Sequence, residues 1–276
     1  MIETLKRIET TRLDLQSVDL IFDEPFLLTV VWDKVRFDFY MRLKKKAENL
    51  FVFGNGAYDP NKMSLPVFQR HSWVGEIGES VIIYNDPTLY LGKINIGWGQ
   101  GTVDRFYLRD ISDILQVIIK KLNMSANQIL FYGSSAGGFM ALYLAGLIKG
   151  SRAIVNNPQT VVSNYYESHV YKMYECSYSG FSKEEIESKY RERLSVIEFY
   201  KEIGYIPNIL YLQNMACEHD VQNHLQPFLG ILKYSKQLFD EKSKVRFEFY
   251  YNEKQGHNPL DKSTTLYYIN TYATSK

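Results

Sequence analysis

The sequence is short of the features that mark secreted, metal-binding or membrane proteins. Among its 276 residues are only two cysteines, Cys176 and Cys217, and no Cys-x-x-Cys or Cys/His spacing typical of metal sites occurs. We therefore expect no bound metal and a reducing compartment. No uninterrupted apolar stretch reaches the ~20 residues of a membrane-spanning helix, and residues 1–7 lack the apolar core of a signal peptide. The sequence predicts a cytoplasmic protein without a membrane span.

An excess of charge of one sign is also absent. The 32 basic and 31 acidic side chains balance, so nothing indicates binding to nucleic acid or to a charged membrane surface. No internal repeat or low-complexity linker divides the chain, and 45% of the residues are hydrophobic. That apolar content is enough for the buried core of one domain of this length. We expect residues 1–276 to form a single domain.

Strand-like and helix-like runs alternate over most of the chain. Two neighbouring runs, 26–32 and 35–41, read as paired strands, and later strands are expected at 50–53, 81–84, 129–132, 153–155, 208–212 and 245–251. A helix is predicted over 108–122, where isoleucines and leucines recur at three- and four-residue steps. Such alternation indicates crossover connections and a mostly parallel sheet covered by helices.

The most informative motif is G-x-S-x-G at residues 133–137, between an apolar strand-like run and an apolar helix-like run. In this context the serine occupies a sharp strand-to-helix turn, where small neighbours let the two arms pack closely and expose its hydroxyl. The first amides of the following helix point towards an oxyanion formed beside that serine. The pattern predicts that Ser135 is a nucleophile. The alternative is a tight turn without chemistry.

A nucleophilic serine needs a base, and the base needs an acid that orients it. His257 follows the last strand-like run and a polar turn, which is the expected setting of the base. The acid is expected beyond the run 208–214, where Glu218 and Asp220 both occur. Asp220 is favoured because it directly precedes a helix-like segment, although an aspartate there could also serve only as a helix N-cap.

These three residues, Ser135, Asp220 and His257, resemble the nucleophile, acid and base of the serine α/β-hydrolase superfamily in order and setting. The resemblance covers roughly residues 50–276. It implies an α/β-hydrolase fold, with a mostly parallel central sheet flanked by helices and a small cap-like insertion. Residues 157–204, which interrupt the alternation of strands and helices, are the expected insertion.

A second resemblance is narrower. The motif Gly133-Ser134-Ser135-Ala136-Gly137-Gly138, followed by Val155-Asn156-Asn157-Pro158-Gln159-Thr160, is similar to bacterial capsular-polysaccharide O-acetyltransferases and to the acetyltransferase subunit of accessory secretion systems. It implies transfer of an acetyl group to a glycan hydroxyl, with acetyl-CoA as the donor and no permanently bound cofactor. Two alternatives stay open: a carboxylesterase, and a non-catalytic partner in glycan or secretion machinery. The oligomeric state is open as well.

The remaining site residues are expected in loops at strand ends. The amide of Ala136 should form one part of the oxyanion hole, and Gly56 and Ala57 should supply the second donor. Asn55, in the same loop, is expected to contact the substrate. The expected substrate-binding residues are therefore Asn55, Trp98, Tyr165 and Tyr166. Trp98 could stack on a sugar ring, or its ring could equally well be packed in the protein core.

Overall fold

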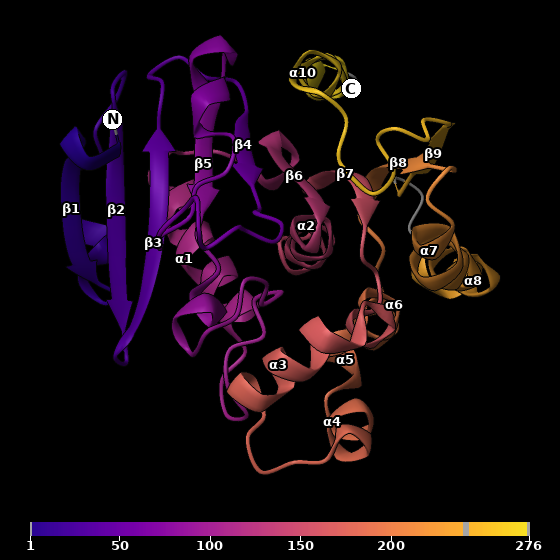
Figure 1. Ribbon diagram of the computed structural model, residues 1–276. Coiled ribbons are helices and arrows are strands. Elements are labelled where there is room, and N and C mark those ends of the chain that lie inside the picture. Colours follow the sequence, from indigo (N-terminus) through magenta and orange to yellow (C-terminus); the bar gives the residue numbers. More distant parts are fainter. Residues whose placement is uncertain (1, 240–242, 275–276) are drawn as a thin grey trace.

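The computed structural model describes residues 2–239 and 243–274, which contain a nine-stranded sheet (Figure 1). Its strands are β1 (Lys6–Thr11), β2 (Pro25–Trp32), β3 (Val35–Arg42), β4 (Leu50–Phe53), β5 (Ser80–Tyr84), β6 (Ile129–Ser135), β7 (Arg152–Pro158), β8 (Asn208–Asn214) and β9 (Val245–Tyr250). Across the sheet they follow the order β1-β2-β3-β5-β4-β6-β7-β8-β9.

Most neighbouring strands run parallel. Only the pairs β2–β3 and β3–β5 are antiparallel, and the first of these is the pairing predicted between runs 26–32 and 35–41. The pairs β1–β2, β4–β5, β4–β6, β6–β7, β7–β8 and β8–β9 are all parallel. Parallel neighbours need crossover connections, which helices supply here. The predicted mostly parallel sheet flanked by helices is therefore confirmed.

The α-helices vary from single turns to fifteen residues. They are α1 (Tyr107–Lys121), α2 (Ala136–Leu147), α3 (Glu167–Ser177), α4 (Lys183–Lys189), α5 (Arg191–Leu194), α6 (Val196–Ile203), α7 (Glu218–Asp220), α8 (Gln226–Gly230), α9 (Ser235–Leu238) and α10 (Lys262–Thr274). The bounds of α1 confirm the helix predicted over 108–122. Within the described ranges, no helix combines the length and apolar character needed to cross a bilayer.

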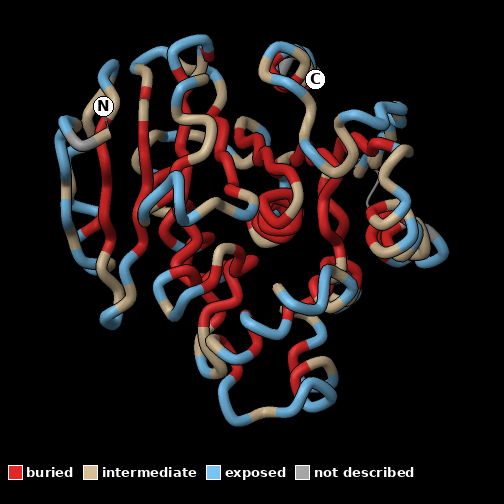
Figure 2. Tube along the Cα trace, viewed as in Figure 1, coloured by how far each residue is buried: buried red, intermediate tan, exposed pale blue. Residues whose placement is uncertain are grey.

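The sheet separates two apolar cores. Helices α1, α2, α6 and α8 pack on one face, and α10 with the 3₁₀ helix η3 (His71–Glu76) packs on the other (Figure 1). Figure 2 shows that burial is concentrated in the central strands and in α2. Every residue of α2 from Ala136 to Gly146 is buried. A helix enclosed on all sides has little freedom to move, so the strand-to-helix turn at its start is held rigidly.

The expected insertion at 157–204 contains α3, α4, α5 and α6. Helix α6 belongs to the core, because Phe199 stacks on Tyr143 of α2 with ring centroids 3.7 Å apart and the Tyr200 hydroxyl donates to the Leu142 carbonyl at 2.8 Å. Helices α3 to α5 lie farther from the sheet (Figure 1). The first residues of the expected insertion, Asn157 and Pro158, are still part of β7.

Candidate active site

Ser135 ends β6 in a strained backbone conformation. Its φ of 54° and ψ of −127° are unusual for a residue with a side chain, and α2 begins at the next residue. The turn also requires two glycines. A Cβ atom on Gly133 would lie 2.1 Å from the Gly137 carbonyl oxygen, and one on Gly137 would lie 2.7 Å from the Gly54 carbonyl oxygen. The tight turn expected from G-x-S-x-G is therefore present, with Ser135 at its apex.

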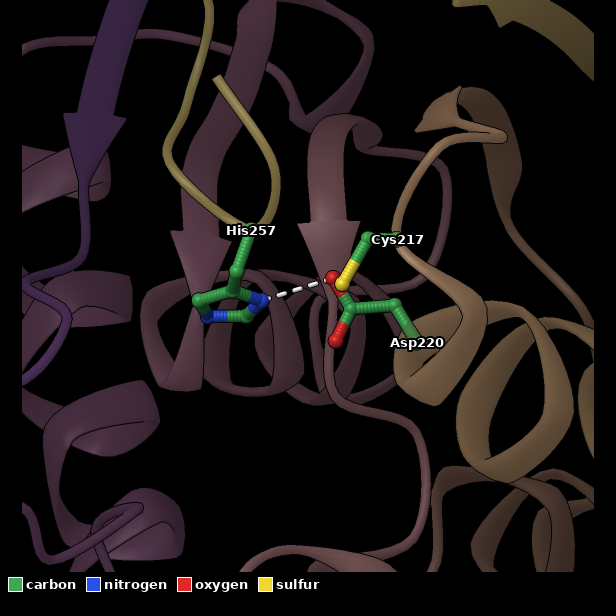
Figure 3. Close-up of side chains that lie close together, drawn as sticks. All are labelled: Cys217, Asp220 and His257. Carbon is green, nitrogen blue, oxygen red and sulfur yellow. Dashed lines mark hydrogen bonds and ion pairs between the residues drawn. The ribbon is translucent and has the colours of Figure 1, made fainter. Parts of the chain in front are cut away.

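Ser135, His257 and Asp220 form one hydrogen-bond chain. The Ser135 hydroxyl lies 2.9 Å from His257 Nε2, and His257 Nδ1 lies 2.6 Å from Asp220 Oδ2, the second contact being drawn in Figure 3. Asp220 is buried, with 1% of its side chain exposed, whereas 30% of the His257 side chain is exposed. Glu218 is exposed and accepts a hydrogen bond from Gln222. Of the two acids considered from the sequence, the structure brings only Asp220 to His257.

Three buried asparagines at the ends of β7 and β8 hold the loop that carries His257. Asn157 Nδ2 donates to the carbonyl oxygen of His257 at 3.2 Å, and Asn156 and Asn214 bond other backbone groups of residues 252–260. These bonds tie a loop of exposed and half-buried residues to the buried ends of β7 and β8. The asparagines thus fix the position of the imidazole. The sequence shows polar residues at both strand ends but not which loop they bond.

Gln159 is a site residue that the sequence analysis did not identify. Its Nε2 donates to the Ser135 hydroxyl oxygen at 3.0 Å, and its Oε1 accepts a short hydrogen bond from Trp98 Nε1. Both Gln159 and Trp98 are fully buried. Of the two alternatives for Trp98, stacking on a substrate and packing in the core, the structure has the packed aromatic, because its ring has no exposed surface. Trp98 thus orients the side-chain amide that contacts the Ser135 hydroxyl.

The loop that carries Trp98 is itself fixed. Trp98 has a positive φ of 51°, and the adjacent Gly99 amide donates to Asp86 Oδ2 at 2.9 Å. Burial raises the pKa of the Asp86 carboxyl, although hydrogen bonds from Gly99 and Thr88 oppose that rise. A buried carboxylate that accepts several bonds stabilises one loop conformation. The indole N–H is consequently held in the direction of Gln159.

One of the backbone amides expected to form the oxyanion hole is already hydrogen-bonded within the protein. Ala136 is the first residue of α2, so its amide has no acceptor within the helix. The loop after β4 also approaches Ser135, since a Cβ atom on Gly56 would lie 3.8 Å from Ser135 Cβ. The Gly56 amide, however, donates to Gln69 Oε1 at 3.0 Å, which corrects the assignment of that amide as an oxyanion donor. Ala57 remains the candidate for the second donor.

The Asn55 side chain is buried and hydrogen-bonded within the protein. It is 3% exposed, and its Nδ2 donates to the carbonyl oxygens of Val67 and Tyr84, both at 2.7 Å. Its Oδ1 accepts from the Gln69 amide at 2.8 Å. These bonds occupy the side-chain amide, so the expected contact between the Asn55 side chain and a substrate is wrong. Asn55 instead stabilises the loop beside Ser135.

Tyr165, one of the two tyrosines expected to contact the substrate, lies near the His257 imidazole, and Tyr166 packs against Tyr165 with ring centroids 4.8 Å apart. The ring centroids of Tyr165 and His257 are 6.3 Å apart, and burial raises the pKa of the Tyr165 phenol to about 12. Tyr166 is 50% exposed and stacks on His219 with a centroid distance of 4.3 Å. The neutral phenol of Tyr165 and the exposed ring of Tyr166 together form an aromatic surface on the side of His257 where Tyr165 lies.

Two groups of side chains have the atoms of a metal site, although no metal is expected. Cys217, Asp220 and His257 form one group (Figure 3), and His219, Asp220 and His224 form the other. Burial raises the pKa of the Cys217 thiol to about 11, which favours the protonated thiol over the thiolate that metals bind. The Thr160 amide donates to His224 Nδ1, so the proton of the neutral ring lies on Nε2. Asp220 belongs to both groups, and its Oδ2 lies 2.6 Å from His257 Nδ1.

A parallel sheet with a serine at a strained strand-to-helix turn, and with an aspartate and a histidine after later strands, defines an α/β-hydrolase. Residues 93–273 match the model of the Prolyl oligopeptidase family. The chain therefore belongs to that family, and the predicted membership of the serine α/β-hydrolase superfamily is confirmed. No curated protein sequence matches the chain.

Several solved structures share the fold. The capsule O-acetyltransferase of Neisseria meningitidis serogroup A has 16% identity and a TM-score of 0.64, covering 87% of this chain and 92% of its own. The glycosylation associate protein complex Gap123 from Streptococcus agalactiae has 17% identity and a TM-score of 0.59, covering 86% and 43%. Prolyl oligopeptidase B from Galerina marginata has 12% identity and a TM-score of 0.61, covering 91% and 36%. At the coarse level, family and fold support acyl transfer or hydrolysis.

Proposed function

We propose that the chain is a serine acyltransferase in which Ser135 is the nucleophile, His257 the base and Asp220 the acid. The observation that carries this proposal is the hydrogen-bond chain of 2.6 Å and 2.9 Å through the imidazole. His257 Nε2 takes the hydroxyl proton as Ser135 Oγ attacks the acyl carbonyl, and returns it to the leaving group. Asp220 keeps the proton on Nδ1 and stabilises the imidazolium.

In this mechanism the oxyanion of the tetrahedral intermediate forms at the start of α2. The Ala136 amide and the partial positive charge of the helix N-terminus would stabilise it, with the Ala57 amide as second donor. Gln159 Nε2 lies 3.0 Å from Ser135 Oγ and would stabilise negative charge on that oxygen when the acyl-enzyme forms and breaks down. These donors are fixed before the substrate arrives, so the reaction needs little reorganisation.

The acyl acceptor in this proposal is a glycan or polysaccharide hydroxyl, and the donor is acetyl-CoA. Support comes from the shared fold with the Neisseria capsule O-acetyltransferase, a variant of which was solved in complex with CoA. The fold shared with the Streptococcus glycosylation associate protein points to glycan chemistry as well. The cap of this single domain would comprise α3 to α5 of the insertion at 157–204, and Tyr165 and Tyr166, just before α3, would contact the sugar.

Hydrolysis of an acyl ester is the second candidate. It is favoured by the match of residues 93–273 to the Prolyl oligopeptidase family, because water is the acceptor in peptidase chemistry. Both candidates share an acyl-enzyme on Ser135 and differ only in what resolves it. An experiment must therefore follow the fate of the acyl group rather than its attachment.

Intact-mass spectrometry after incubation with acetyl-CoA, with and without capsular or cell-wall oligosaccharides, separates the candidates. We expect an acetyl adduct on Ser135 that decays slowly in water and quickly when an acceptor glycan is present. A variant carrying Tyr165→Ala and Tyr166→Ala should form the adduct but lose the acceleration by glycan. If water alone resolves the adduct and no glycan matters, the chain is an esterase. If no adduct forms from acetyl-CoA or from a small acetyl ester, both candidates fail.

The pair Gln159 and Trp98 provides a test of the hydrogen bond to the nucleophile. Gln159→Met keeps the side-chain volume but removes the donor, and we expect kcat to fall about 10- to 100-fold with little change in KM. It also leaves the Trp98 indole N–H unpaired, which should destabilise the fold by about 1–3 kcal/mol.

The matched control combines Gln159→Met with Trp98→Phe. Removing both partners of a buried hydrogen bond costs less than removing one, so the double variant should regain stability in thermal unfolding without regaining kcat. Recovery of kcat together with stability would mean that Gln159 acts only through the fold. Unchanged kcat in Gln159→Met would remove its proposed role.

A further inference from the structure

The last strand of the sheet, β9, has an open edge. It pairs with β8 on one side, and among residues 2–239 and 243–274 no strand pairs with its other side. Phe249 on this strand is 51% exposed, and Arg246 and Glu248 are exposed as well. An edge strand with exposed aromatic rings is a template for pairing with another strand, unless charge or shape prevents it.

The backbone groups available for pairing follow from the bonds to β8. The carbonyl oxygens of Lys244 and Tyr250 accept from the amides of Ile209 and Met215, at 2.9 Å and 2.7 Å. Even-numbered residues of β9 therefore direct their N–H and C=O groups inward, since these groups alternate along a strand of a parallel pair. The backbone groups of Val245, Phe247 and Phe249 consequently face the open edge.

When two copies of β9 run antiparallel to each other, the basic side chain of one copy can face the acidic side chain of the other. We propose that β9 pairs antiparallel with β9 of a second copy of this chain, centred on Phe247. In this register Val245 lies opposite Phe249 of the second copy, so all outward backbone groups meet as hydrogen-bonded pairs. Arg246 lies opposite Glu248 of the second copy, and the same pair forms again on the other side of the two-fold axis.

Charge selects this register over its neighbours. A shift of the centre by one residue preserves the backbone pairing but places Arg246 opposite Arg246 of the second copy, or Glu248 opposite Glu248 of the second copy. Like charges directly opposite destabilise a sheet, whereas opposite charges stabilise it. These residues form the non-hydrogen-bonded pairs, in which side chains approach more closely. The proposed register is thus the one in which both charged residues are matched.

The two faces of β9 also suit an extended sheet. Phe247 packs on Tyr211 and Phe228, with ring centroids 5.4 Å and 6.3 Å apart, so this face continues the core beneath α8. Phe249 follows Phe247 on that face and would be covered by the second copy. On the other face, Glu248 accepts from the Tyr268 hydroxyl of α10, which holds the carboxylate beside the edge. Pairing would therefore bury an exposed aromatic ring and unpaired backbone groups together.

Sedimentation of the full chain over a range of concentrations tests the proposal, with twice 32.3 kDa as the expected mass. Arg246→Glu and Glu248→Arg each replace two attractive pairs by two repulsive ones, so each should weaken the dimer by at least about tenfold. The double variant restores both pairs and should dimerise again. A mixture of the two single variants should form a heterodimer, because each supplies the charges that the other lacks.

Lys6→Glu, on β1 at the opposite edge of the sheet, is the matched control and should leave the mass unchanged. Circular dichroism of each variant shows whether it folds. The mixing experiment is informative because a heterodimer can form only if both single variants fold. A chain that is monomeric at all concentrations would overturn the proposal. So would a dimer that neither charge reversal weakens. Catalysis in the monomer would be compatible with either result, so the proposed function is tested separately.

Discussion

Ser135→Ala is expected to lower kcat for acyl transfer or hydrolysis by a factor on the order of 10⁶, the loss found when the nucleophile of a catalytic triad is removed. The hydroxyl oxygen is the atom that forms the acyl bond, and no neighbouring group can replace it. Alanine retains the Cβ atom that the strained turn already accommodates, so the thermal unfolding temperature should stay close to that of the parent chain. Turnover of a chromogenic acetyl ester and thermal unfolding measure the two quantities.

The adjacent serine gives the matched control. Ser134 accepts a hydrogen bond from Arg70 Nη2 at 2.7 Å but makes no contact with His257, so Ser134→Ala should retain most of the activity. His257→Ala should be about as damaging as Ser135→Ala. The double variant should be no worse than either, because residues that act as a unit give non-additive losses. Turnover by Ser135→Ala near that of the parent chain would contradict the proposed mechanism.

The fold and the relative order of the site residues could be predicted because they depend on patterns along the chain. Alternating apolar runs specify strands and crossover helices, and the carboxyl ends of parallel strands meet at one edge of the sheet. Ser135 ends β6, and Asp220 and His257 follow β8 and β9, so their convergence follows from topology. From the sequence, Asp220 was favoured over Glu218 by its position alone. The structure supplies the physical reason, because the Asp220 carboxylate is buried beside His257.

The positions whose expected substrate or oxyanion contacts the structure does not bear out, Trp98, Asn55 and the Gly56 amide, depend on packing that no local pattern records. A tryptophan between two glycines looks the same in sequence whether its ring is exposed or enclosed. Here a positive φ directs the ring inward, where its N–H meets Gln159. Asn55 likewise looks like a free polar side chain in a glycine-rich loop, but its partners come from segments distant in sequence. Side-chain orientation in loops is a tertiary property, and Gln159 was missed for the same reason.

Asp220→Asn is expected to lower kcat by ~10⁴-fold, because an amide at this position no longer holds the proton of His257 on Nδ1. The carboxylate is buried and lies 2.6 Å from Nδ1, so the amide can occupy the same volume and the geometry should persist. An asparagine NH₂ group facing Nδ1 would favour the tautomer with the proton on Nε2. That tautomer cannot accept the Ser135 proton, so the nucleophile loses its base without losing its position.

Glu218→Gln is the control that isolates this effect. Glu218 is exposed and bonds only Gln222, so its neutralisation should change kcat by less than about twofold, as for most surface substitutions. Steady-state turnover of an acetyl ester by both variants, with thermal unfolding as a check on the fold, makes the comparison direct. If Glu218→Gln were the more damaging, the loop from 215 to 221 would have to rearrange in the working enzyme so that Glu218 reaches the imidazole. Burial of Asp220 and the solvent position of Glu218 argue against that rearrangement, since an exchange would leave one carboxylate buried without its partner.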